Sequence, residues 1–144
     1  MQLKFEFDTK TYFGRDVTTD EVSEFLEKHY GILEAFVEAH NDDFAKLIEN
    51  DVAEMFVKMA EKGVAPTLAK ASKHSMLVIK SMFDTFIRSR EVEGLVPNAP
   101  TERAKRGFKS GTKRRKGRSF GTSRPSFLDT ELYVKSFKAT IIDD

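Results

Sequence analysis

The sequence predicts an α+β fold: a long antiparallel helical hairpin plus a small β element, with an extended N-terminal arm and a basic loop. Apolar residues recur at helical spacing through most of residues 19–88, which is typical of amphipathic helices. Short segments with strand character lie near both ends of the chain. The 144 residues fit one domain. Its expected parts are an N-terminal arm or strand (1–17), a helical body (18–93), a linker and basic loop (94–126), and a short helix with a C-terminal strand (127–144).

The N-terminal segment alternates apolar and polar residues from Leu3 to Asp8. This period of two predicts a short half-buried strand or an extended arm. The segment 11–15 contains Tyr12, Phe13 and a glycine, and we expect a loop that buries these aromatic side chains.

The first helix is expected to begin after Thr18, because Thr18 and Glu21 have the spacing of a capping box. The apolar stripe then continues in phase, so we expect one long helix over 19–62 with a possible kink near 40–43, or two nearly collinear helices. Gly31 costs about 1 kcal/mol relative to alanine in a helix, and we do not expect it to break this one.

The first helical stretch is expected to end at Lys62, followed by Gly63 as the C-terminal glycine. Pro66 suits the first turn of a second helix, whose apolar stripe runs from Leu68 to a close near Arg88. Because the connection is short, the two helical stretches are expected to pack as an antiparallel hairpin.

The remaining segments are a linker, a basic run and a C-terminal element. Residues 91–100 are expected to be a linker with a brief contact at Leu95 and Val96. The basic run 103–124 is rich in glycine and serine, which predicts a long loop or a hairpin; Phe108 and Phe120 would lie on its two strands. Asp129 and Thr130 can cap a short helix over 131–136, and 137–142 has strand character.

The net charge of +1 conceals a strong asymmetry. Residues 101–126 hold ten Lys or Arg and one acid, which leaves 14 bases and 22 acids for the rest of the chain. Such a protein can bind a polyanion, or it can bind another copy of itself, basic loop to acidic body. Thirteen Phe residues also exceed what a small core needs, which suggests that some face partner subunits.

Composition excludes several classes of protein. The absence of Cys excludes disulfides and thiolate metal sites. No apolar run reaches the roughly 20 residues that span a bilayer, and the N-terminus lacks the apolar region of a secretory signal. We therefore expect a soluble chain, made inside the cell, without membrane contact.

No catalytic or metal constellation is recognisable, and we expect neither enzymatic activity nor a cofactor. His29, His40 and His74 are expected to be packing or surface residues. Ser72, His74, Ser75 and Asp84 lack a nucleophile motif. The paired acids 42–43 and 143–144 are expected to be solvated.

The basic run is the main candidate site. It would contact nucleic-acid phosphates, dock on a neighbouring subunit, or remain a solvated loop. Its candidate contact residues are Arg103, Lys105, Arg106, Lys109, Lys113, Arg114, Arg115, Lys116, Arg118 and Arg124.

The C-terminal segment 124–139 resembles a motif of small virion proteins of tailed bacteriophages: the neck, tail-completion, minor-tail and virion-morphogenesis proteins. In that family a basic, glycine-rich stretch precedes a proline and then a Leu-x-Asp-Thr-Gly-x-Leu-x-x-Ser-Ile/Phe block. Glu131 replaces the glycine of the motif. The residues that we assign to this motif are Leu128, Asp129, Thr130, Leu132, Ser136 and Phe137.

The resemblance implies a structural subunit that forms a homo-oligomeric ring in the virion, between portal or adaptor and tail or at the end of the tail tube. Its neighbours would be portal, adaptor or tail proteins. Residues 113–116 would contact packaged DNA if the loop faces the lumen, and Leu128, Leu132 and Phe137 would anchor the C-terminal element on the helices. The alternative function is that of a stand-alone nucleic-acid-binding protein that uses a basic hairpin over 103–124.

Overall fold

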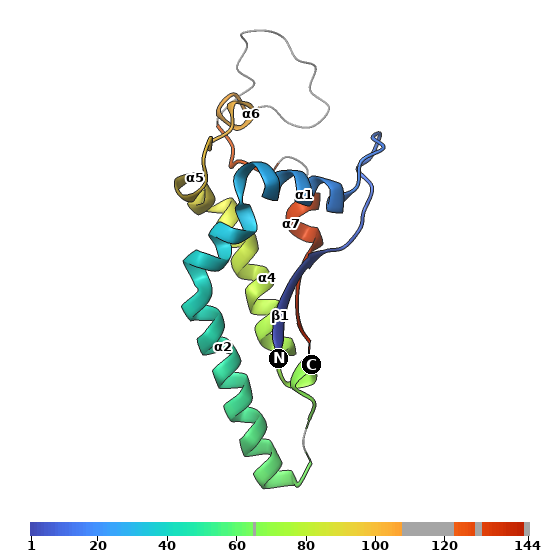
Figure 1. The fold of residues 1–144 in the computed structure, drawn as a ribbon, viewed down its shortest axis with the longest axis vertical. Coiled ribbons are helices and arrows are strands. Elements are labelled where there is room, and N and C mark those ends of the chain that lie inside the picture. The colour runs from blue at the N-terminus through green and yellow to red at the C-terminus, as the bar shows by residue number, and fades with distance from the viewer. Residues whose placement is uncertain (65, 108–122, 129–130, 143–144) are drawn as a thin grey trace.

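A computed structural model describes residues 1–64, 66–107, 123–128 and 131–142. The molecule is elongated, and its two longest helices run side by side for part of its length (Figure 1). The elements, in order, are β1 (Gln2–Phe7), α1 (Thr19–Tyr30), α2 (Ile32–Lys62), α3 (Leu68–Ala71), α4 (Lys73–Arg88), α5 (Glu91–Leu95), α6 (Glu102–Lys105), α7 (Leu132–Ser136) and β2 (Phe137–Ile142).

The predicted α+β class is confirmed, because α2 and α4 form an antiparallel hairpin that carries a two-stranded sheet. Strands β1 and β2 pair antiparallel, from Gln2 opposite Ile142 to Phe7 opposite Phe137. The two ends of the described chain therefore lie next to each other (Figure 1). Both strands were expected from the sequence, whereas their pairing was not.

Aromatic rings join the sheet to the hairpin. Phe137 of β2 is fully buried and stacks on Phe83 of α4, with ring centroids 4.2 Å apart. Phe36 of α2 is also fully buried and lies 5.2 Å from Phe83 and 6.4 Å from Phe5 of β1. Each such ring pair contributes about 0.5–1.5 kcal/mol beyond its burial. The core therefore forms where β1, β2, α2 and α4 meet.

The expectation of one helix, or two collinear helices, over 19–62 is wrong. The chain breaks at Gly31, which has a φ of 61°, and α1 lies across the end of α2 (Figure 1). The Glu27 carboxylate explains the break, because it accepts hydrogen bonds from the Leu33 and Glu34 amides at 2.7 and 3.1 Å. A carboxylate at a helix N-terminus satisfies otherwise unpaired donors and suits the helix dipole. The helix is uninterrupted at 40–43, where the kink was expected.

Several boundaries agree with the sequence. The Thr18 amide donates to the Glu21 carboxylate at 3.0 Å, as in a capping box. Helix α2 ends at Lys62, and Gly63 follows in a left-handed conformation. The close of the second helix near Arg88 is also confirmed, although a break at Ser72 divides this stretch into α3 and α4.

Two local expectations are wrong. Residues 91–95 form the short helix α5 rather than a linker, with Val92 fully buried; Val96 makes the expected contact, but Leu95 is exposed. The loop after β1 does not bury both of its aromatic side chains, because Tyr12 is half-buried but Phe13 is completely exposed at the tip of a turn. The reason is the turn itself: the Tyr12 amide donates to the Val17 carbonyl at 3.0 Å, which closes a short loop away from the core.

Candidate functional site

The basic run begins and ends at one point of the fold. The Ala104 carbonyl accepts hydrogen bonds from the amides of both Gly107 and Arg124, each at 3.1 Å. Gly107 precedes residues 108–122, which lie outside the described residues, and Ser123 and Arg124 follow them, so the described residues on the two sides of this segment lie side by side. The expected hairpin strands around Phe108 and Phe120 lie outside the described residues.

A polar cluster, which we call the stem clamp, fixes this point to α5. Arg90 donates to the Ser123 carbonyl at 2.6 Å, and the carboxylate of Glu93 accepts from the Ser126 amide at 2.8 Å. The Ser126 hydroxyl accepts in turn from the Thr101 amide at 3.0 Å, and Ser126 is fully buried. The stem clamp thus holds the base of the basic run in one orientation at the α6 end of the molecule.

The predicted cations fall into two groups. Arg103 lies in α6, Lys105 pairs with Glu102 at 2.9 Å, Arg106 is exposed, and Arg124 donates to the Pro125 carbonyl at 3.0 Å. The structure brings the backbone of these four residues together beside the stem clamp, because the Arg124 amide donates to the Ala104 carbonyl of α6. The other predicted contact residues lie outside the described residues: Lys109, Lys113, Arg114, Arg115, Lys116 and Arg118.

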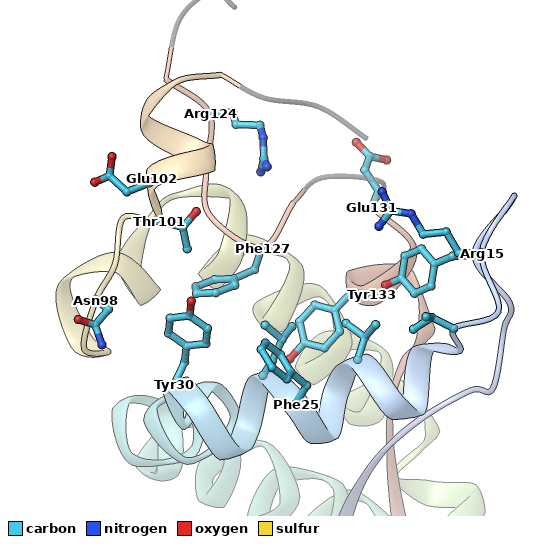
Figure 2. Close-up of a pocket in the computed structure, with 14 residues that line it drawn as sticks. Arg15, Phe25, Tyr30, Asn98, Thr101, Glu102, Arg124, Phe127, Glu131 and Tyr133 are labelled. Carbon is cyan, nitrogen blue, oxygen red and sulfur yellow. The ribbon is translucent and has the colours of Figure 1, made fainter. Parts of the chain in front are cut away.

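A groove beside the stem clamp, which we call the α1 groove, has a volume of about 660 Å³. It lies between α1, the loop after β1, and the segments before and after the basic run (Figure 2). Its apolar side chains come from elements far apart in the sequence: Val22, Phe25, Leu26 and Tyr30 from α1, and Phe127 and Tyr133 from the C-terminal segment.

Charged side chains lie on the side of the α1 groove away from α1, among them Arg15, Arg124 and Glu131 (Figure 2). Glu131 accepts from Lys135 at 2.9 Å and from Arg88 at 3.2 Å. These two bonds hold the pKa of its carboxyl below the ordinary value. Burial raises the pKa of Tyr133, so its phenol is neutral at physiological pH.

The residues of the C-terminal motif surround the turn between the basic run and β2. Glu131, at the position of the motif glycine, has a φ of 61°. Leu128 and Leu132 are half-buried, whereas Ser136 and Phe137 are fully buried. The Ser136 hydroxyl donates to the Tyr133 carbonyl and its own carbonyl accepts from the Asp8 amide, both at 2.8 Å. Asp129 and Thr130 lie outside the described residues.

The sequence-level candidates for catalysis do not come together in the described part of the chain. The Ser72 and Ser75 hydroxyls donate to the carbonyls of Leu68 and Leu47, and Asp84 pairs with Arg88. No cluster of three or more His, Asp or Glu side chains with metal-binding geometry occurs among the described residues. Within the same residues, no helix combines the length and the apolar character needed to cross a membrane.

Sequence reasoning missed the α1 groove. The available signal was Phe25, which lies on the apolar stripe of α1 yet is 54% exposed. Its ring stacks on His29 with a centroid separation of 4.0 Å instead of entering the core. The remaining lining residues lie at distant points of the chain, and only the fold brings them together.

No protein-family model matches the chain, and no curated protein or solved structure matches it at a significant level. The resemblance to phage virion proteins therefore rests on the C-terminal motif of the sequence.

Proposed function

We propose that this chain is a structural subunit of a tailed-phage virion, a neck or tail-completion protein that assembles into a ring and has no enzymatic activity. The ring would contact portal, adaptor or tail proteins. The basic run would face either a neighbouring subunit or the DNA channel.

The observation that carries this proposal is the backbone at Glu131. The motif has glycine at this position, and Glu131 adopts the left-handed conformation, with φ 61° and ψ −7°, that glycine accommodates without steric cost. A non-glycine residue there costs about 1–2 kcal/mol. A left-handed residue at the position of the motif glycine supports the proposed resemblance, and the ion pairs of Glu131 with Arg88 and Lys135 offset part of the conformational cost.

The surface offers further support for an assembling subunit. Residues 19–62 hold twelve acids and four bases and are therefore acidic, whereas the basic run holds ten cations. Phe13, Phe25 and Phe56 are all more than half exposed. Exposed aromatic residues are typical of protein interfaces.

Immunogold electron microscopy tests the proposed role. An antibody raised against the purified chain should label phage particles from the producing cells at one point, the head–tail junction or the tail end. Pre-immune serum on the same particles is the control. Label spread over the head shell, or found only on material outside particles, would contradict the proposal.

A second function, nucleic-acid binding by the isolated chain, is favoured by the density of cations in the basic run. Phosphate contacts release counterions, so the affinity would fall with salt by a log–log slope of about −0.9 per phosphate contact. Replacing Lys113, Arg114, Arg115 and Lys116 by Gln should then weaken duplex binding and reduce this slope.

The control for that experiment is the double variant Lys58→Gln/Lys62→Gln, which removes two cations from the last turns of α2, at the end of the molecule opposite α6 (Figure 1). Fluorescence anisotropy with a labelled duplex at several salt concentrations measures both variants. Equal loss of affinity in both would count against a binding site on the basic run.

A further inference from the structure

The second half of α2 has an apolar face that the rest of the chain covers only in part. The buried residues of α2 are Ile32, Phe36 and Phe44, all in its first half, whereas Val52, Met55 and Met59 farther along the apolar stripe are half-buried. We call residues 49–62 the α2 arm. Phe56 and Val57 in this arm are 60% and 55% exposed. An amphipathic helix with an open apolar face is a common element of helix-in-groove recognition.

The stripe of the α2 arm has the regular spacing of such a recognition helix. Val52, Met55, Phe56 and Met59 follow the i, i+3, i+4, i+7 pattern, which places them on one face. The arm spans roughly 21 Å at 1.5 Å per residue. It extends to the end of the molecule opposite α1 and α6 (Figure 1).

The α1 groove is complementary to this arm in chemistry. Its apolar side is formed by aromatic and branched residues of α1, and Arg15 and Arg124 line the other side. The arm carries four acids and two lysines, one of which, Lys58, is paired with Glu54 at 3.1 Å. The two acids that line the groove are already paired: Glu102 with Lys105, and Glu131 with Lys135 and Arg88. An acidic apolar helix therefore matches an apolar groove with arginines at its rim.

The arm and the groove lie at opposite ends of one molecule (Figure 1), so a chain cannot fill its own groove with its own arm. We propose that the α2 arm of one copy docks in the α1 groove of a second copy. This contact is heterologous, and repetition of it produces a closed ring or an open filament. The inference rests on the proposed role as an assembling subunit and names the two surfaces that would assemble.

Two variants test the contact separately. Phe56→Glu places a charge on the arm, and Phe25→Glu places one in the groove. Both side chains are more than half exposed, so thermal unfolding should show that both variants stay folded. Leu77→Glu on α4, which replaces an equally exposed residue outside both surfaces, is the matched control. Sedimentation velocity measures association at low and high salt.

The wild type and Leu77→Glu are expected to form species larger than the monomer, more strongly at low salt. Each of the other two variants alone should lose all such species. Mixing Phe56→Glu with Phe25→Glu should restore a one-to-one dimer and nothing larger, because the mixture contains one intact groove and one intact arm per pair.

Three results would overturn the proposal: a wild type that stays monomeric, a mixture that stays monomeric, or association lost in Phe56→Glu but kept in Phe25→Glu. The last would mean that arms pack against arms. If immunogold labels the virion neck and the mixing experiment fails, only the contact is wrong. If the mixing experiment succeeds and no particle is labelled, only the virion role is wrong.

Discussion

The two halves of α2 are alike in sequence but differ in environment. Both carry apolar residues at helical spacing, yet Phe36 contacts the rings of β1, α4 and β2, whereas Phe56 is mostly exposed. The difference arises from length. Helix α2 has 31 residues and α4 has 16, so α4 can cover only about half of its partner. The comparison teaches that an apolar stripe predicts a helix face that needs a partner, without identifying the partner.

The largest expected effect comes from truncating one phenylalanine in each half. Phe36→Ala should destabilise the protein by about 3–5 kcal/mol, because it opens a cavity among six packed rings. Phe56→Ala should change the free energy of unfolding of the monomer by only about 0.5 kcal/mol. Urea unfolding at a concentration where the chain is monomeric measures both, and equal losses would mean that the second half of α2 is covered within the monomer.

The glycines that bound α2 sharpen the comparison. Gly31 and Gly63 both have left-handed φ angles, 61° and 67°, which cost alanine about 1–2 kcal/mol. Gly31→Ala should cost this full amount, because the buried half of α2 and its carboxylate cap are held in place. Gly63→Ala should cost less, because the free end of the arm can fray. Thermal unfolding of the two variants compares them, and a larger loss for Gly63→Ala would contradict this account.

The smallest expected effect concerns the sheet that covers the buried half. Lys138 of β2 donates to Asp8, at the end of β1, at 2.6 Å, and this bond lowers the pKa of the Asp8 carboxyl from 3.8. A lowered pKa stabilises the fold above about pH 4, and this stabilisation is lost as the pH falls through the folded-state pKa.

Asp8→Asn should therefore be less stable than the wild type at neutral pH, and the two should converge in acid. Urea midpoints from neutral pH to about pH 2 measure this convergence. In a Lys138→Gln background the same substitution should have a smaller effect. An undiminished effect in that background would show that Asp8 acts through another partner.

Local signals predicted many of the elements because their causes are local. The capping residues Thr18 and Glu21, and the glycine after Lys62, act within one helical turn, and the structure places helix ends there. The break at Gly31 was missed because it depends on the Glu27 side chain, which reaches forward to the next helix. Because glycine occurs both within helices and in the turns between them, the residue type at Gly31 did not decide between these two structures.

The candidate site was predictable only in part. The basic run could be identified by counting charges, because its ten cations lie within one short segment of the sequence. The α1 groove was not predictable, since Arg15, Phe25 and Phe127 come from separate elements. The motif turn lies between these cases: its residues were recognisable, but the left-handed backbone at Glu131 required the structure.

The sequence by itself determined the long helical stretches, the two strands, the α+β class and the separation of acidic body from basic run, because periodicity, capping and charge are properties of neighbouring residues. The tertiary structure alone decided that β1 pairs with β2, that α1 turns across α2, and which half of α2 is buried. These features depend on contacts between residues far apart in the chain and on the relative lengths of the packed helices, and no local pattern encodes them.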